Sequence, residues 1–214
     1  MGKHYDESVI PVELRRDFDV YDRIKELGID LGNRDELVSL KGRSICGAIV
    51  HESGLVYLSG VGMGEMQMSD DPETVAHGQA AAAQCAQYHL RTLHWTLSCG
   101  GEGDLNDVLY TVKAIGMVVS TDVAFNSGPA VTNGYTKVWQ DVFGGAIGHY
   151  AQDGADASYS GVHARSAIGG FTGRFSLEPE MIVAIPPTLS RDIITNRGWV
   201  FPLIPSMYDK VLGK

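Results

Sequence analysis

The sequence predicts an α+β fold: a mixed β-sheet with two helices packed on one of its faces. Apolar β-branched runs and helical patterns follow the order strand, strand, helix, strand, helix, strand, strand, so a helix stands beside strands twice. The 214 residues, 44% of them hydrophobic, can build such a core without disulfides or metals. A two-layer domain of this kind leaves one sheet face open, and an open apolar face calls for a partner subunit.

The chain divides into three regions on this reasoning. Residues 1–44 form an arm and a short helix, 45–187 the α+β domain, and 188–214 a C-terminal tail whose apolar residues dock on the domain. Within the first region, residues 17–27 predict the short helix, because their apolar side chains recur near helical spacing and Gly28 follows.

The first half of the domain begins with a hairpin and a long helix. Ile45–Val50 and Leu55–Ser59 are two strands joined by a tight turn. The helix has Asp71 as its N-cap and Pro72 at its first position, and it continues to Gly100–Gly101. Its alanine run allows close approach to the sheet.

The second half supplies the remaining elements. Residues 104–120 contain a strand buried on both faces. Val131–Phe143 is a helix, and 144–162, which is low in large apolar residues, is a surface excursion. The apolar runs Ser166–Phe171 and Met181–Ile185 then predict two paired or neighbouring strands.

Each closing strand begins with a charged residue, which core packing does not require. Arg165 precedes one apolar run and Glu180 precedes the other. Charged side chains are almost never fully buried unless they are paired. Two alternatives follow: the charges decorate exposed strand ends, or they point into a pocket that needs a cation and a carboxylate.

Composition excludes several classes of function. The net charge is −9 and no window is rich in Lys or Arg, so neither nucleic acid nor a membrane surface is an expected partner. No apolar window approaches the roughly 20 residues of a membrane span, and the N-terminus lacks a signal-peptide core, so we expect a cytoplasmic protein. The three cysteines have no CxxC spacing and the helical histidines no i, i+4 spacing, so we expect no metal site.

Five pieces of the sequence together resemble the Rid/YjgF family of imine deaminases, in particular a longer branch with a YDRIKELGI-type helix near its N-terminus. They are spread over residues 17–186, and the Ala-Arg-Ser piece is the most specific. The pieces are Tyr21–Ile29, Val56–Gly60, Gly103–Val108, Val142–Gly144 and His163–Gly169.

The resemblance implies a chorismate-mutase-like fold and a homotrimer with active sites in clefts between subunits. In the family an arginine, here Arg165, binds the carboxylate of a small 2-imino or enamine acid, which suits the fork of a guanidinium. A glutamate at the head of the last strand places the attacking water. Counting from Arg165 assigns this role to Glu180, with Glu178 as the alternative because Pro179 can shift the register.

The same resemblance names further site residues and marks departures. Ser166 and Ser59 would contact substrate, and Asn133 and Thr136 compete for another substrate-contacting position. Cys46 stands where many members have a tyrosine, Ala167 replaces a cysteine after the Arg-Ser pair, and the 144–162 segment is longer than usual.

The expected activity is therefore hydrolytic deamination of a small carboxylate-bearing imine or enamine, with no cofactor. Two alternatives remain open. One is hydrolysis of an amide or ring C–N bond with Cys46 as nucleophile, activated by His51 or Arg165. The other is a non-catalytic trimer that binds small carboxylates. The ordinary structural roles are an ion pair for Arg165 and a packing position for Cys46.

Overall fold

The computed structural model describes residues 16–33, 46–144, 161, 163–171 and 175–201. Six strands form one mixed sheet in the order β4-β3-β5-β2-β1-β6, and of their pairs β3–β4 is parallel and the others antiparallel. The strands are β1 (Ala48–His51), β2 (Leu55–Leu58), β3 (Tyr110–Val119), β4 (Ala164–Phe171), β5 (Leu177–Ala184) and β6 (Val200–Phe201).

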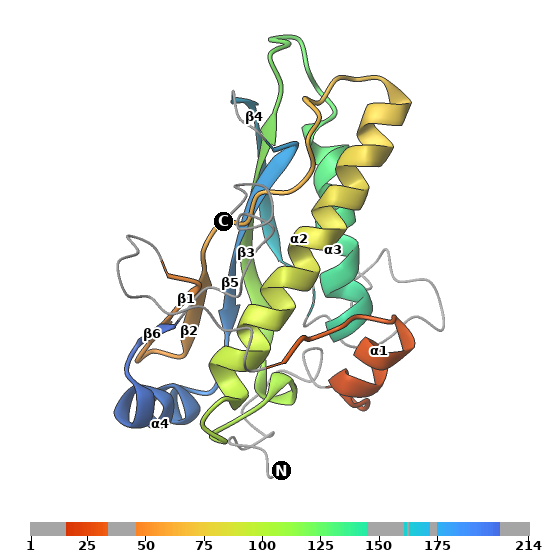
Figure 1. Cartoon of the computed structure of the whole chain (residues 1–214). Coiled ribbons are helices and arrows are strands. Elements are labelled where there is room, and N and C mark those ends of the chain that lie inside the picture. Colours follow the sequence, from red (N-terminus) through yellow and green to blue (C-terminus); the bar gives the residue numbers. More distant parts are fainter. Residues whose placement is uncertain (1–15, 34–45, 145–160, 162, 172–174, 202–214) are drawn as a thin grey trace.

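Two long helices, α2 (Pro72–Ser98) and α3 (Gly128–Phe143), lie side by side along one face of this sheet (Figure 1). The shorter helix α1 (Val20–Glu26) lies beside α3, and α4 (Pro187–Arg197) lies at the end of the sheet near β1. A short 3-10 helix, η4 (Leu105–Asp107), precedes β3. The predicted α+β class and the two helices on one face are confirmed.

Local sequence explains where the two long helices begin. Asp71 caps α2 by accepting a hydrogen bond from the backbone N–H of Thr74, and Pro72 follows at the first position. Helix α3 has no capping bond from its own N-cap, Ser127. Instead the carboxylate of Asp70, just before α2, accepts from the backbone N–H groups of Asn126 and Ser127. These two hydrogen bonds connect the start of α2 with the start of α3.

The helix pair is in very close contact, because small residues stand at the crossing. A Cβ atom on Gly134 would lie 2.0 Å from the carbonyl oxygen of Gln79 on α2, so only glycine fits there. The core around this contact consists of fully buried large side chains. Its largest members are Trp139, Tyr135, Phe143, Met63, Leu90, Leu93 and Leu97.

The two faces of the sheet differ along every central strand. On β3, Ala114, Gly116 and Val118 are buried against the helices, and the alternate residues point the other way. We call this other side the open face, because no described helix covers it (Figure 1). Its half-buried or exposed side chains are Ile49, Tyr57, Lys113, Ile115, Met117, Ser166, Ile168, Glu178, Glu180 and Ile182.

Three expectations about elements need correction. The two closing strands are neither paired nor adjacent, because β3 lies between β4 and β5. The strand predicted within residues 104–120 is β3, which follows the 3-10 helix η4, but it is not buried on both faces, because Lys113, Ile115 and Met117 are only half-buried on the open face. The predicted tail contains helix α4 and strand β6, and β6 extends the sheet beside β1.

Parts of the predicted tail and excursion lie outside the described residues, namely 202–214 and most of 144–162. Gly144 and Gly161 of the excursion are described, and they meet: the backbone N–H of Gly161 donates to the carbonyl of Gly144 at 2.8 Å. The division of the chain into three regions stays a prediction.

Candidate functional site

Arg165 is held on the helix-covered side of the sheet, at the outer strand β4. It pairs with Ala114 on β3, whose side chain faces the helices, so the guanidinium reaches α3. Its Nη1 donates to Asn133 Oδ1 and to Thr136 Oγ1, both at 2.9 Å, and its Nη2 donates to the carbonyl of Pro129 at 3.2 Å. The structure thus brings three predicted binding residues, Arg165, Asn133 and Thr136, into one cluster.

All three acceptors of Arg165 are neutral, and no carboxylate of the described residues forms an ion pair with it. Partial burial lowers the pKa of the guanidinium, although it remains charged at neutral pH. Three hydrogen bonds fix its orientation, and none of the described residues compensates its charge. Such a group is prepared to bind an anion, most favourably a carboxylate in the fork of its remaining N–H groups.

His163 extends this cluster. Its Nδ1 lies 3.0 Å from the carbonyl of Gly161, which only accepts, so Nδ1 carries the proton. Nε2 is then the acceptor of the Thr136 hydroxyl at 3.2 Å. Burial, together with the nearby Arg165 cation, lowers the pKa of His163, although its bond to Gly161 opposes the shift. The neutral ring therefore orients Thr136, whose oxygen lone pairs face Arg165.

Ser166 and Glu180 belong to the open face, on the opposite side of the sheet from the Arg165 guanidinium. Ile115 of β3 pairs with Ser166 on one side and with Glu180 on the other, so the three share one row. Leu58 pairs with Met181, which makes Ser59 the next residue beside Glu180. Predicted site residues from β2, β4 and β5 therefore gather on this face.

Lys113, on the same face and two residues before Ile115, contacts this row and is not among the predicted site residues. Its Nζ donates to Ser166 Oγ at 2.8 Å. In the sequence it is a single cation inside an apolar run, DVLYTVKAIGMVV, where nothing distinguishes it from a solvent-facing strand position. Only the pairing of β3 with β4 reveals its proximity to Ser166.

Glu178 differs from Glu180 in its surroundings. Glu180 is exposed, whereas Glu178 is half-buried beside Gly60. A Cβ atom on Gly60 would lie 2.5 Å from Glu178 Oε1, so the carboxyl rests against the bare backbone of that glycine. Burial and the negative charge of Glu180 raise the pKa of Glu178. A carboxyl with a raised pKa is the better general acid or base, which favours the alternative that the sequence left open.

Cys46 is half-buried just before β1, and its neighbour Gly47 accepts a hydrogen bond from the backbone N–H of Ser59. Strand β1 is four strand spacings from β4, about 19 Å, so Arg165 does not reach it. His51 is five residues farther along, about 16 Å in extended chain. Its Nδ1 binds Ser53 Oγ instead. Neither proposed activator therefore reaches Cys46 within one chain, and its role as a nucleophile stays a prediction.

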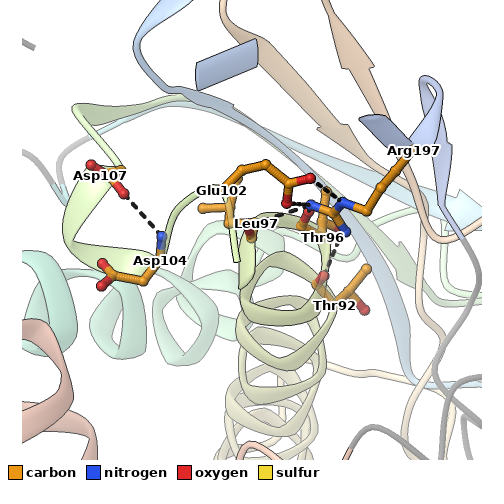
Figure 2. A network of polar contacts seen from close by, with 7 residues as sticks. All are labelled: Thr92, Thr96, Leu97, Glu102, Asp104, Asp107 and Arg197. Carbon is orange, nitrogen blue, oxygen red and sulfur yellow. Dashed lines mark hydrogen bonds and ion pairs between the residues drawn. The ribbon is translucent and has the colours of Figure 1, made fainter. Parts of the chain in front are cut away.

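A second polar network lies at the C-terminal end of α2 (Figure 2). Arg197 of α4 pairs with Glu102 through Nη2 at 2.9 Å and also donates to the carbonyl of Thr96 at 2.6 Å. Helix ends leave such carbonyls without partners, and a cation there also complements the helix dipole. The charges satisfy each other, so this network fastens α4 to α2. A cavity of about 210 Å³ lies next to it, lined by Thr92, Trp95, Thr96, Cys99, Arg197, Val200 and Phe201.

Within the described ranges, no group of three or more metal-ligating side chains comes together. The part of the chain that the structure describes also contains no helix with the length and apolarity to cross a membrane. The expectations of no cofactor, no metal and a cytoplasmic location stay predictions.

No protein-family model and no curated protein matches the chain. Solved structures do. The protein Atu1372 of unknown function from Agrobacterium tumefaciens is 24% identical, with a TM-score of 0.56 over 78% of this chain and 92% of that one. A putative endoribonuclease from Shewanella oneidensis MR-1 is 13% identical, with a TM-score of 0.59 over 78% of this chain and 100% of that one. The chain therefore shares the fold of these two proteins.

Proposed function

We propose that this chain is a Rid-type hydrolytic deaminase that acts on a small carboxylate-bearing imine or enamine and releases ammonia. The single observation that carries the proposal is Arg165, a guanidinium fixed by three neutral acceptors with no carboxylate partner among the described residues. The shared fold and the Ala-Arg-Ser motif support it.

The proposed reaction needs a bound carboxylate and a positioned water. Arg165 holds the substrate carboxylate, which makes the attack of water effectively intramolecular. The water oxygen bonds to the C=N carbon, and the carboxyl of Glu178 transfers a proton from this water to the nitrogen. The carbinolamine then expels ammonia and leaves a 2-oxo acid. An enamine substrate first takes a proton on carbon to become the imine.

We further propose that the working form is a homotrimer with its sites between subunits. Arg165 and Glu178 lie on opposite faces of one sheet, so a small acid touching both must lie between two copies. The apolar side chains of the open face, among them Tyr57 at 41% exposed and Ile168 at 44%, support such a contact.

The function is tested by measuring ammonia release from 2-imino acids generated in situ by an amino-acid oxidase. We expect Arg165→Ala to lower kcat/KM about 100-fold or more, because a bidentate charge-assisted contact is lost. Lys137→Ala is the matched control, since it removes an exposed cation from α3 that pairs with Asp141. Equal rates for Arg165→Ala and wild type would end the deaminase proposal.

Mixing two inactive variants tests the site between subunits. Arg165→Ala and Glu178→Gln each carry one lesion, so each alone is inactive in this scheme. After denaturation and refolding at equal amounts, random assembly gives about a quarter of the sites an intact Arg165 and an intact Glu178 from different chains. Recovery of about that fraction of activity is expected, whereas no recovery would assign both residues to one chain.

Two other functions give different outcomes. If Cys46 is the nucleophile of an amide or ring hydrolase, Cys46→Ser removes turnover of such substrates, and an unaffected rate excludes it. If the protein only binds small carboxylates, Arg165→Ala abolishes binding while no imine, enamine or amide in a broad screen releases ammonia. The net charge of −9 weighs against an RNA substrate of the kind that the name of the Shewanella protein implies.

A further inference from the structure

Two buried side chains of α2 contact the backbone that follows β2. His89 Nε2 lies 2.9 Å from the carbonyl oxygen of Ser59, and Cys85 Sγ donates to the carbonyl of Val61 at 3.1 Å. Cys85 and His89 are one helical turn apart and so point the same way from α2. Between their two acceptors lies Gly60. We call residues 59–61 the glycine bend.

The hydrogen bonds define the state of the His89 ring. The Ser59 carbonyl only accepts, so Nε2 carries the proton. Nδ1 is then the acceptor of the Tyr135 hydroxyl, 2.5 Å away on α3. Complete burial lowers the pKa of His89 to about 4, which agrees with a neutral ring. Tyr135 therefore fixes both the tautomer and the orientation of the ring, as a second partner does for many ligating histidines.

The glycine bend in turn holds two candidate site residues. Ser59 is one of them, and Gly60 provides the surface on which the Glu178 carboxyl rests. Backbone hydrogen bonds attach the bend to both neighbouring strands: Ser59 N–H donates to the carbonyl of Gly47 and Val61 N–H to that of Pro179. A displacement of the bend would therefore move the Glu178 carboxyl relative to the reacting carbon.

We propose that His89, oriented by Tyr135 and assisted by Cys85, is a positioning residue that sets the glycine bend and through it the water-placing carboxyl of Glu178. This inference rests on the proposed deaminase function. If Cys85 and His89 only had to satisfy their hydrogen-bonding groups in the core, their two acceptors would not need to belong to the same backbone segment. Here, two donors from one helix face converge on a single bend, next to a titratable group with a raised pKa.

Two substitutions separate the contacts of the ring. In His89→Gln the side-chain amide reaches as far as Nε2 and retains the donor to Ser59. In His89→Asn it reaches only as far as Nδ1, so the contact with Tyr135 remains and the one with Ser59 is lost. Both variants are polar and uncharged, so the direction of the difference shows which contact matters more: a higher kcat in His89→Gln reports the Ser59 contact, and a higher kcat in His89→Asn reports the Tyr135 contact.

For turnover of in situ 2-imino acids, we expect His89→Asn to lower kcat about tenfold with KM within about twofold, because Arg165 lies on β4, three strands away from the glycine bend that follows β2. His89→Gln restores kcat to within about threefold of wild type. Equal kcat values for the two variants, or an effect confined to KM, would overturn the proposal.

Two measurements on the protein without substrate keep the inference testable even if wild type turns over nothing. Ring ¹⁵N NMR at neutral pH should show His89 neutral with its proton on Nε2; a proton on Nδ1 overturns the assignment. Amide hydrogen exchange at Ser59 and Val61 should accelerate in His89→Asn and return in His89→Gln. Unchanged exchange in both variants would show that His89 does not set the bend.

Discussion

The two faces of the sheet are made by the same strands, yet their side chains differ in burial and in polar contacts. Along β3, Ala114, Gly116 and Val118 are buried beneath α2 and α3, whereas Lys113, Ile115 and Met117 alternate with them on the open face. On the covered face, His89 and Tyr135 satisfy each other. On the open face, carboxylates, a lysine and apolar side chains remain half-exposed. We therefore expect stability to depend mainly on the covered face. Assembly and water placement would depend on the open face, and Arg165 would bind the substrate carboxylate from the edge of the covered side.

Two tyrosines, one on each side of the sheet, test this division with the largest expected effect. Tyr135 is 1% exposed on the covered side and Tyr57 is 41% exposed on the open face. Tyr135→Ala should lower the free energy of unfolding by about 3–5 kcal/mol, because it leaves a large cavity and removes the partner of His89 Nδ1. Tyr57→Ala should lower it by less than about 1 kcal/mol in the monomer and weaken self-association instead.

Urea unfolding and light scattering measure these two quantities. A large loss of monomer stability in Tyr57→Ala would contradict the division between the faces. So would a Tyr135→Ala protein that is as stable as wild type.

The pH dependence of the free energy of unfolding tests the covered face in a second way, through His89. His89 has its pKa lowered from 6.5 to about 4 in the folded protein, so the unfolded chain takes up a proton first as the pH falls. This difference in pKa contributes about 3 kcal/mol to the free energy of unfolding. The contribution is complete above pH 6.5 and is lost progressively between pH 6.5 and about 4. Tyr135, which binds the ring, and Cys85, one helical turn away, have raised pKa values and stay neutral there.

The measurement is urea unfolding of wild type and His89→Gln between pH 4 and 7. The difference between the two proteins should shrink as the pH falls through this window. A constant difference would mean that His89 titrates at its ordinary pKa, and a difference that grows as the pH falls would mean that the folded protein carries the ring charged.

The smallest expected change in stability comes from the open face. Gly60 has no positive φ, so its backbone accepts alanine, but the new methyl would displace the Glu178 carboxyl. Gly60→Ala should change the free energy of unfolding by less than about 1 kcal/mol and lower kcat about tenfold. Ammonia release and urea unfolding of the same preparation test both parts. Full activity would return the water-placing role to Glu180.

Much of the covered face follows from local sequence. The Asp71–Pro72 start of α2 and the helix that ends at Phe143 are predicted from the sequence, and both are confirmed. Helix α4 lies mostly in the predicted tail, where no helix is expected from the sequence, although Pro187 suits the first turn of one.

The candidate site was less predictable, because strand order and burial are not local properties. Ser166 and Lys113 meet only because β4 pairs with β3, and they are 53 residues apart. Glu178 and Glu180 look alike in the sequence, and only the approach of Gly60 distinguishes them. The hydrogen bonds of His89 with Tyr135 and of His163 with Thr136 also join separate elements.

Gly134 links the two regions in a further way. It stands between Asn133 and Thr136, the two α3 side chains that hold Arg165, and its missing side chain sets how closely α3 lies on α2. During evolution, the geometry of the proposed carboxylate site around Arg165 therefore depends on keeping glycine at position 134. A larger residue at position 134 would move α3 and with it Asn133 and Thr136, which bind Arg165. We therefore expect changes in substrate preference to arise first on the open face, with this helix crossing unchanged.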